Sequence, residues 1–354
     1  MPHPDVILEL PTVWFENVED GDRHRRFYVS IWQALGDLGV TVRPIPLRFG
    51  ADAAPRLSYH DQLVVSFHSR GPIGNVLRMK ESYVPPYYTA DRAGYSGFSE
   101  LALYPERFKG EVEATPTAAA IDFVDALKRD IVAANLSKYP QRHDGVEILP
   151  ERYVFLPLQT VDDPVAELCE LEQIAVLETL LQATAALGWG MVVKRHPRCR
   201  SLRVASSLER LAAQHPHLKR SDASVHRLVS SAEAVVGANS GVLFEALLHG
   251  AHVVSFAKSD FRVVTTPISH HADLPSAILG RGRVSRDRQC RFLYWYLRNH
   301  CLRADDVSAI RGRFAAALSR LDRAPDPHHQ AQIDLFDRFA REEAQRRRTF
   351  FAEG

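Results

Sequence analysis

Short apolar runs and helix-like segments alternate regularly in the second half of the chain. The runs that have the character of strands cover residues 153–158, 191–195, 234–237 and 253–256. The helical patterns between them cover residues 167–187, 202–214 and 241–248. Strands that alternate with helices form a parallel sheet covered on both faces, and ligands bind in the loops at the carboxyl ends of its strands. This half therefore predicts a Rossmann-like unit.

The first half shows a similar but less regular alternation. Apolar runs at residues 5–10, 40–47 and 63–67 predict strands, and an amphipathic pattern at 27–38 predicts a helix. Residues 80–115 are different, because they are rich in Tyr, Pro and Gly and have little periodicity. We expect this stretch to lack regular structure, and such a long irregular segment is usually functional or mobile.

Residues 137–150, which follow a helical pattern over 118–138, contain two prolines, one glycine and little apolar content. This composition predicts a hinge between domains. The chain has 354 residues, and single cores stop growing near ~250–300 residues, so the length also favours two domains. We predict an N-terminal Rossmann-like domain over 1–145, a C-terminal Rossmann-like domain over 146–305 and a helical segment over 306–354.

Charge and composition exclude several classes of protein. The 44 Lys and Arg balance 43 Asp and Glu, so no overall field favours nucleic acid. Four scattered cysteines form no CxxC pair and sixteen histidines form no HExxH motif, so we predict neither a disulfide framework nor a metal site. There is no secretory signal and no apolar stretch near the ~18 residues of a membrane span, so we expect a cytoplasmic protein. The basic stretch 346–348 would allow only weak peripheral attraction to the inner face of an anionic membrane.

Residues 235–250 form the segment that most resembles a binding site. A buried strand leads into Asn239 and Ser240, which are good N-cap residues, and an apolar helix follows. Glu245 lies inside that helix, where a carboxylate is costly unless it has a partner. The start of the helix at Ser240 and Gly241 suits a phosphate, and Glu245 suits the hydroxyls of a ribose. The alternative is a core helix whose Glu245 pairs with an arginine.

The segment from Lys194 through Arg195 and His196 to Pro197 directly follows a predicted strand. Basic side chains at the carboxyl end of a strand suit an anionic ligand, and the proline fixes the turn. The segment lies one βαβ unit before Ser240, so we expect the two to be neighbours in the sheet. The alternative is a solvated basic turn.

A third polar segment, residues 157–164, also follows a predicted strand. It contains Asp163, with Gln159 four residues earlier. A carboxylate at the end of a strand suits a nucleophile or a base. The alternative is a solvated cap that begins the next helix at Pro164.

Four blocks of the sequence stand in an order that a known family shares. They are residues 80–99, 157–163, 196–197 and 239–250, and a trailing segment at 292–297 is also similar. In turn they resemble the Gly-Tyr-x-x-Pro…Glu-x-x-Gly…Ser block, the Gln-x-x-x-Asp motif, the HP motif and the Ser…Glu-Ala-Leu-x-x-Gly block of the capsule polysaccharide biosynthesis family. The best-described members of this family are bacterial β-Kdo glycosyltransferases. Kdo is a deoxy octulosonic acid that is delivered as CMP-Kdo.

The resemblance implies a GT-B-like α/β fold, in which the parallel sheets of two Rossmann-type domains face each other across the active-site cleft. It also implies retaining transfer of a β-Kdo residue from CMP-Kdo to a saccharide or glycolipid acceptor, by double displacement and without a metal or cofactor. Asp163 matches the nucleophile of the family. Asp91, which stands where the family has Glu, matches the residue that would deprotonate the acceptor.

Other roles follow from the resemblance in the same way. The residues expected to bind the nucleotide-sugar are Gln159, Lys194, Arg195, His196, Pro197, Asn239, Ser240, Gly241 and Glu245. The basic turn at His68 and Arg70 is a candidate for contact with the carboxylate of the sugar.

Two alternatives stay open at this point. The same cleft would suit another nucleotide-activated donor, such as a UDP-sugar or CDP-glycerol, which would not require a nucleophile at Asp163. A protein of a different class, a non-catalytic sugar-binding or nucleotide-binding subunit of a capsule assembly complex, would also use these segments.

Overall fold

The computed structural model describes residues 5–16, 18–47, 61–141 and 147–321. In these ranges the chain forms two α/β halves, each built on a six-stranded sheet. The predicted α/β, GT-B-like architecture of two Rossmann-type units is thereby confirmed. None of the helices in these ranges has both the length and the apolar character that crossing a membrane requires.

The second sheet is entirely parallel and contains the alternation that the sequence predicts. In spatial order its strands are β11 (Thr266–Pro267), β10 (Val253–Ser255), β9 (Ala234–Gly237), β6 (Tyr153–Pro157), β7 (Gly190–Lys194) and β8 (Leu218–Arg220). All residues of β6 and β9 are buried, as expected for central strands with helices on both faces. The strand order reverses between β6 and β9, and such a switch point is where parallel sheets bind ligands.

The first sheet combines four parallel strands with an antiparallel edge. In spatial order its strands are β12 (Leu302–Arg303), β5 (Tyr87–Asp91), β4 (Val76–Glu81), β3 (Leu63–Phe67), β1 (Val6–Pro11) and β2 (Val42–Leu47). Strands β2, β1, β3 and β4 pair in parallel, whereas β5 pairs antiparallel with both β4 and β12.

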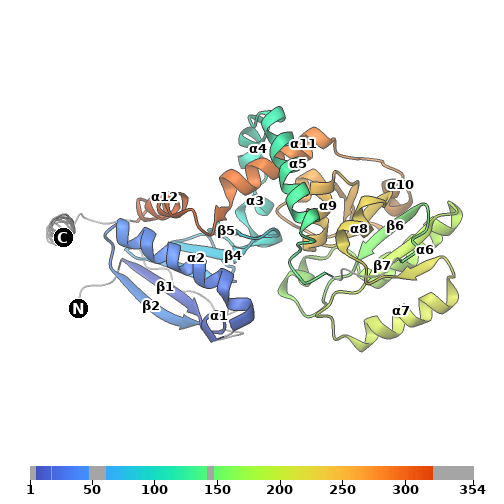
Figure 1. Ribbon diagram of the computed structural model, residues 1–354, viewed down its shortest axis with the longest axis horizontal. Coiled ribbons are helices and arrows are strands. Elements are labelled where there is room, and N and C mark those ends of the chain that lie inside the picture. Colours follow the sequence, from blue (N-terminus) through green and yellow to red (C-terminus); the bar gives the residue numbers. More distant parts are fainter. Residues whose placement is uncertain (1–4, 17, 48–60, 142–146, 322–354) are drawn as a thin grey trace, which may run out of the picture.

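Helices cover both sheets and also fill the space between the two halves (Figure 1). The helices that pack on the first sheet are α2 (Val18–Asp37) and α12 (Val307–Leu318). Those on one face of the second sheet are α6 (Gln173–Ala186), α7 (Leu202–Gln214) and α10 (Leu274–Ile278). Those on its other face are α5 (Thr117–Ala133), α8 (Val225–Ser230), α9 (Gly241–His249) and α11 (Arg286–Trp295). The short helices are α1 (Val13–Glu16), α3 (Glu100–Leu103) and α4 (Glu106–Glu113).

The apolar cluster around α9 joins the two halves. Besides the helices of the second half it contains Val84 and Tyr87, which come from the hairpin between β4 and β5. Figure 1 shows α4, α5 and α11 together above the gap between the sheets. The two halves therefore share buried apolar surface and do not meet through a linker alone.

The prediction that residues 80–115 lack regular structure is wrong. The segment contains the end of β4, all of β5 and the helices α3 and α4. Its strand residues are buried on both faces, and the closely spaced prolines and tyrosines hide the alternation that usually reveals a strand.

After α11 the chain crosses back to the first half. β12 pairs with β5, and α12 packs beside α2. The sequence predicts a helical segment over 306–354, whose described part contains α12, but the two-residue strand β12 before it leaves no pattern. The sequence assigned residues up to 305 to the second half, so this return is a difference from the predicted division.

Gly97 marks a close approach between the two halves. It lies in the short turn η2 (Ser96–Phe98), and a Cβ atom there would stand 2.6 Å from the carbonyl oxygen of Lys258. We expect Gly97→Ala to lower the free energy of unfolding by about 1–3 kcal/mol, because backbone must move to admit the methyl group.

The matched control is Gly110→Ala in α4, where nothing lies within 4 Å of the added Cβ. That change should stabilise the protein by about 0.5–1 kcal/mol, since alanine favours a helix. Urea unfolding of the two variants measures the contrast. A Gly97→Ala protein as stable as the wild type would show that the halves do not pack this closely.

Candidate functional site

A cavity of about 380 Å³ lies between the two halves. Its wall in the first half comes from the end of β4 and the residues around η2, and its wall in the second half comes from the ends of β6 and β7 and the start of α9. The linker residues 137–141 complete it. The predicted catalytic and nucleotide-sugar-binding residues other than Asp91 all line this cavity, so the structure brings together segments that are far apart in the sequence.

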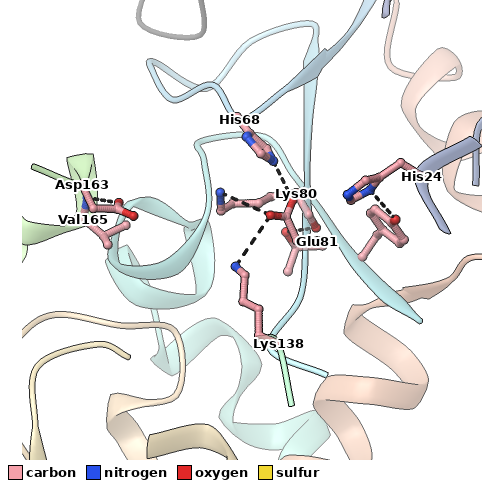
Figure 2. A network of polar contacts seen from close by, with 9 residues as sticks. His24, His68, Lys80, Glu81, Lys138, Asp163 and Val165 are labelled. Carbon is pink, nitrogen blue, oxygen red and sulfur yellow. Dashed lines mark hydrogen bonds and ion pairs between the residues drawn. The ribbon is translucent and has the colours of Figure 1, made fainter. Parts of the chain in front are cut away.

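Asp163 lies on the wall of the second half, at the N-cap of the short helix η3 (Pro164–Leu168). Its Oδ1 accepts a hydrogen bond of 3.0 Å from the backbone N–H of Val165. Its Oδ2 has no hydrogen-bond or ion-pair partner in the described part of the chain. Figure 2 shows the carboxylate turned toward Lys80 on the opposite wall. Asp163 is therefore both a cap, as the alternative proposed, and an accessible carboxylate in the cavity.

Hydrogen bonds from neighbouring strands hold the turn that carries this carboxylate. The Asn239 Nδ2 donates to the carbonyl oxygens of Val165 at 3.0 Å and Lys258 at 3.2 Å. The backbone N–H of Asn239 in turn donates to the Gln159 Oε1 at 3.4 Å. Gln159 thus joins the carboxyl end of β6 to that of β9, which gives a physical reason for a glutamine four residues before an aspartate at this position.

Lys194 and His196, at the end of β7, are both oriented by backbone groups. The Lys194 Nζ donates to the carbonyl oxygens of Asp222 at 3.2 Å and Ala223 at 2.5 Å. The backbone N–H of Arg198 donates to the His196 Nδ1 at 3.1 Å, so in the neutral ring the proton is on Nε2. Burial lowers the pKa of His196, although Asp163 opposes the change. His196 is thus prepared to donate from Nε2.

Arg195 does not fit its predicted role. Its Nη2 donates to the carbonyl oxygens of Cys199 at 2.8 Å and Ser201 at 3.2 Å. These bonds direct the guanidinium to the turn that follows β7. Arg195 belongs to the lining of the cavity, but its charged group holds this turn and is not offered to an anionic ligand.

The start of α9 supplies a second polar feature of the same wall. The Ser240 Oγ caps the helix by accepting from the backbone N–H of Val242 at 3.3 Å. The first N–H groups of the helix and its positive dipole end adjoin the cavity at Ser240 and Gly241. Such a terminus suits a phosphate group.

Glu245 is 2% exposed and yet lines the cavity. Its Oε1 accepts from the Ser137 Oγ at 2.7 Å, whereas its Oε2 is buried and has no hydrogen-bond partner. Burial raises the pKa of this carboxyl group to about 7. The structure does not show the alternative arrangement in which Glu245 pairs with an arginine. An unpaired buried carboxylate oxygen requires a donor, which the hydroxyl groups of a ligand can supply.

The structure does not bring Asp91 to the cavity. Its Oδ1 accepts from the backbone N–H groups of Ala93 at 2.7 Å and Gly94 at 2.8 Å, and its Oδ2 accepts from that of Glu100 at 2.9 Å. Burial raises the pKa of Asp91 to about 6 in spite of these bonds. The carboxylate stabilises the turn between β5 and α3, so its position does not support the predicted role on the acceptor side.

The candidates for contact with a sugar carboxylate are also engaged elsewhere. Arg70 forms a two-fold ion pair with Glu167 of the opposite half, with 3.0 Å between Nη2 and Oε2. The His68 Nε2 lies 2.6 Å from the Glu81 Oε2. Neither residue lines the cavity, so the structure does not offer them to a ligand there.

Among the polar residues of the cavity that sequence reasoning did not assign to the site are Lys80, Glu81, Lys138 and Tyr139. The Lys80 Nζ and Lys138 Nζ lie 4.0 Å and 3.6 Å from the Glu81 Oε1 (Figure 2). The Tyr139 ring meets the His196 ring edge to face, with 4.9 Å between centroids. The only signal was that Lys80 and Glu81 belong to the first block of the family resemblance.

In the described ranges no three His, Cys, Asp or Glu side chains gather as a metal ion would require. The charged and titratable residues that line the cavity instead include acidic, basic and imidazole side chains, which are Glu81, Asp163, Asp222, Glu245, Asp260, Lys80, Lys138, Lys194, Arg195 and His196. Glu81 lies beside two of the lysines. This arrangement can bind an anionic ligand with hydroxyl groups and can present one unengaged carboxylate to it.

The burial of Glu245 makes a prediction about stability. Because folding raises the pKa of this carboxyl group from 4.5 to about 7, the stability that it contributes is complete below pH ~4.5 and is lost as the pH rises through 7. The uncharged variant Glu245→Gln should therefore be more stable than the wild type at pH 8, by up to about 3 kcal/mol, and similar to it at pH 5.

Urea unfolding at the two pH values tests this, and Glu209→Gln, an exposed position on α7, is the control. If Glu245→Gln were no more stable than the wild type at pH 8, the Oε2 atom would have to have a partner in the unliganded protein.

Solved structures similar to this chain include two described as beta Kdo transferases, both from Thermosulfurimonas dismutans KpsC. The 2,4 transferase is 15% identical, with a TM-score of 0.48, over 83% of this chain and 91% of that chain. The 2,7 transferase is 12% identical, with a TM-score of 0.49, over 88% of this chain and 99% of that chain. The UDP-GlcNAc 2-epimerase of Methanocaldococcus jannaschii is 11% identical, with a TM-score of 0.38, over 89% of this chain and 98% of that chain.

No curated protein matches the chain. Residues 149–266 match the sequence model of a family described as capsule polysaccharide biosynthesis protein. This range contains β6 to β11 and all the predicted catalytic and nucleotide-sugar-binding residues except Asp91. The resemblance to the capsule polysaccharide biosynthesis family that the motifs predicted is therefore confirmed over residues 149–266.

Proposed function

We propose that this protein is a glycosyltransferase of bacterial surface polysaccharide synthesis that transfers a β-Kdo residue from CMP-Kdo to a saccharide or glycolipid acceptor. The proposed transfer retains configuration and passes through a covalent intermediate at Asp163. The observation that carries the proposal is the position of Asp163, whose Oδ2 is unengaged in a cavity that also holds groups suited to a nucleotide.

The nucleotide is placed on the wall of the second half. The phosphate of CMP would lie at the start of α9, where the helix N–H groups and dipole favour an anion. The ribose hydroxyls would donate to the Glu245 Oε2, which lacks a donor. Lys194 and the Nε2–H of His196 would stabilise the negative charge that develops on the phosphate as it leaves.

Two displacements at the anomeric carbon account for retention. First, the Asp163 Oδ2 attacks that carbon, and the bond to the phosphate oxygen breaks with its electron pair remaining on CMP. Second, the hydroxyl of the acceptor attacks the same carbon, Asp163 leaves as a carboxylate, and the hydroxyl proton passes to a base. Asp91 stands outside the cavity lining, whereas Glu81 is a carboxylate of the first half that lines it. Glu81 is, however, held by His68 and lies beside Lys80 and Lys138, which lower its pKa, so we assign the base on the acceptor side to neither carboxylate.

The covalent intermediate is open to direct detection. Wild-type protein mixed with CMP-Kdo and no acceptor should gain the mass of one Kdo residue on intact mass spectrometry, because the first displacement needs no acceptor. Asp163→Ala should gain none. The matched control is Asp162→Ala, which removes the neighbouring carboxylate of the same turn and should still form the adduct. An adduct that survives in Asp163→Ala would assign the nucleophile elsewhere.

The nucleotide site makes a second prediction. His196→Ala should weaken the binding of CMP about 10-fold in calorimetric titration and leave that of cytidine nearly unchanged, since the ring is proposed to contact the phosphate. The exposed His270→Ala is the control. Stronger binding of UDP or CDP than of CMP would instead favour a UDP-sugar or CDP-glycerol donor. Equal CMP affinity in His196→Ala would remove this residue from the phosphate site.

A further inference from the structure

Two lysines stand together on the wall of the cavity that faces Asp163. Lys80 is the next-to-last residue of β4, and Lys138 belongs to the linker after α5. Figure 2 shows both side chains reaching the Glu81 carboxylate from different directions. Lys80 and Glu81 are neighbours in β4, whereas Lys138 is far from them in the sequence, so the fold gathers two positive charges at one place in the cavity.

Neither ammonium group has a hydrogen-bond acceptor in the described part of the chain. The distances to the Glu81 Oε1, 4.0 Å for Lys80 and 3.6 Å for Lys138, exceed the ~2.7–3.2 Å of an N–H···O bond. The Lys80 Nζ also lies 4.6 Å from the centroid of the Tyr95 ring, which holds it by a cation–π contact and leaves its N–H groups available.

The charges in this cluster do not cancel. Glu81 supplies one negative charge against the two lysines, and its other partner is His68. Burial lowers the pKa of His68 more than Glu81 raises it, so the ring is neutral at pH 7. Burial also lowers the pKa of Lys80, which an anionic ligand would offset. The wall opposite Asp163 is therefore positively charged and would be stabilised by a further anion.

This second anion is not the phosphate of the nucleotide. The start of α9, Lys194 and His196 already provide a phosphate site on the other wall. The lysine pair instead faces Asp163, and Lys80 is close enough to influence it electrostatically. The ligand group that meets the lysines therefore belongs to the sugar, near the carbon that Asp163 attacks.

An ulosonic acid has a carboxylate attached directly to its anomeric carbon, whereas a neutral hexose has no charge there. When Asp163 attacks that carbon, two carboxylates come within a few ångströms of each other, and their repulsion opposes the reaction. Cations beside the sugar carboxylate would offset this repulsion.

We propose that Lys80 and Lys138 jointly bind the carboxylate of the donor sugar and select sugars that carry an acid group on the anomeric carbon. Each ammonium group donates to one carboxylate oxygen, and Glu81 keeps the pair together when the site is empty. The inference rests on the proposed function only in placing the sugar of the donor at Asp163.

The test replaces each lysine by methionine, which keeps most of the aliphatic chain and removes the charge. Lys80→Met and Lys138→Met should each raise the KM for CMP-Kdo about 10–100-fold, the loss expected for a charge-assisted hydrogen bond. The Kd for CMP alone should change less than about 2-fold. Lys138→Arg should recover most of the affinity, and Lys109→Met, exposed on α4, is the control.

The outcomes separate this inference from the proposed function. If the wild type transfers Kdo and both methionine variants keep its KM, the lysines do not bind the carboxylate and the inference is overturned. If no transfer occurs at all, the proposed function fails, and titration with free Kdo in the presence of CMP still decides about the lysines. Weaker binding of free Kdo to the double variant would support the pair, and equal binding would overturn it. An unchanged Kd for CMP shows that the variants are folded.

Discussion

The buried carboxylate of Asp260 joins the three parts of the chain that surround the cavity. It is 1% exposed, its Oδ1 accepts from the Tyr83 hydroxyl at 2.7 Å, and its Oδ2 accepts from the Tyr296 hydroxyl at 2.7 Å. Tyr83 follows β4 in the first half, Asp260 follows β10 in the second, and Tyr296 lies at the end of the helix that crosses back. Burial raises the pKa of Asp260, and the two hydroxyl groups oppose the change. Since breaking either bond would leave a buried polar group without a partner, this junction fixes how the two walls face each other.

The position of that junction has a direct consequence for the site. Tyr83 is two residues beyond Glu81, so the bond that holds the hairpin against the second half also holds the end of β4, which carries Lys80 and Glu81. The close packing of Gly97 on Lys258 acts on the same interface, and Asn239 bonds to the carbonyl of Lys258 and to the turn after Asp163. The accessible carboxylate and the positive wall are therefore held by one continuous set of contacts and not by two independent domains.

The second half and the first three strands of the first half were predictable from the sequence, whereas the region from β4 to α4 was not. Helix α7 begins and ends where its amphipathic pattern predicts, and the strand leading to Ser240 is a buried apolar run bounded by good cap residues. In contrast, β4 and β5 have no alternation of buried and exposed residues, because β5 is buried throughout and the first four residues of β4 are buried. Asp91 shows a different limit of prediction from the sequence. Sequence resemblance gave it a role, but its carboxylate accepts three backbone N–H groups, and local turns of this kind depend on geometry that residue type alone does not reveal. Lys80 and Lys138 were missed because only the fold brings their ammonium groups together near the Glu81 carboxylate, in the same cavity as Asp163.

The two walls divide the negative charges of the proposed donor between them, and this division matters for the order of events. In the proposed complex the phosphate would lie against α9, Lys194 and His196, whereas the sugar carboxylate would lie against Lys80 and Lys138, all of which line the cavity. When CMP leaves after the first displacement, the contacts on the second half are lost, but those with the sugar carboxylate are not. The lysine pair would then hold the covalently bound sugar in place, with its reacting carbon oriented, while the acceptor enters the vacated side. If all the cations of the site contacted the phosphate, no ionic contact with the sugar would remain after CMP leaves. A separate pair of positive charges at Lys80 and Lys138 would therefore keep the covalently bound sugar oriented until the acceptor binds.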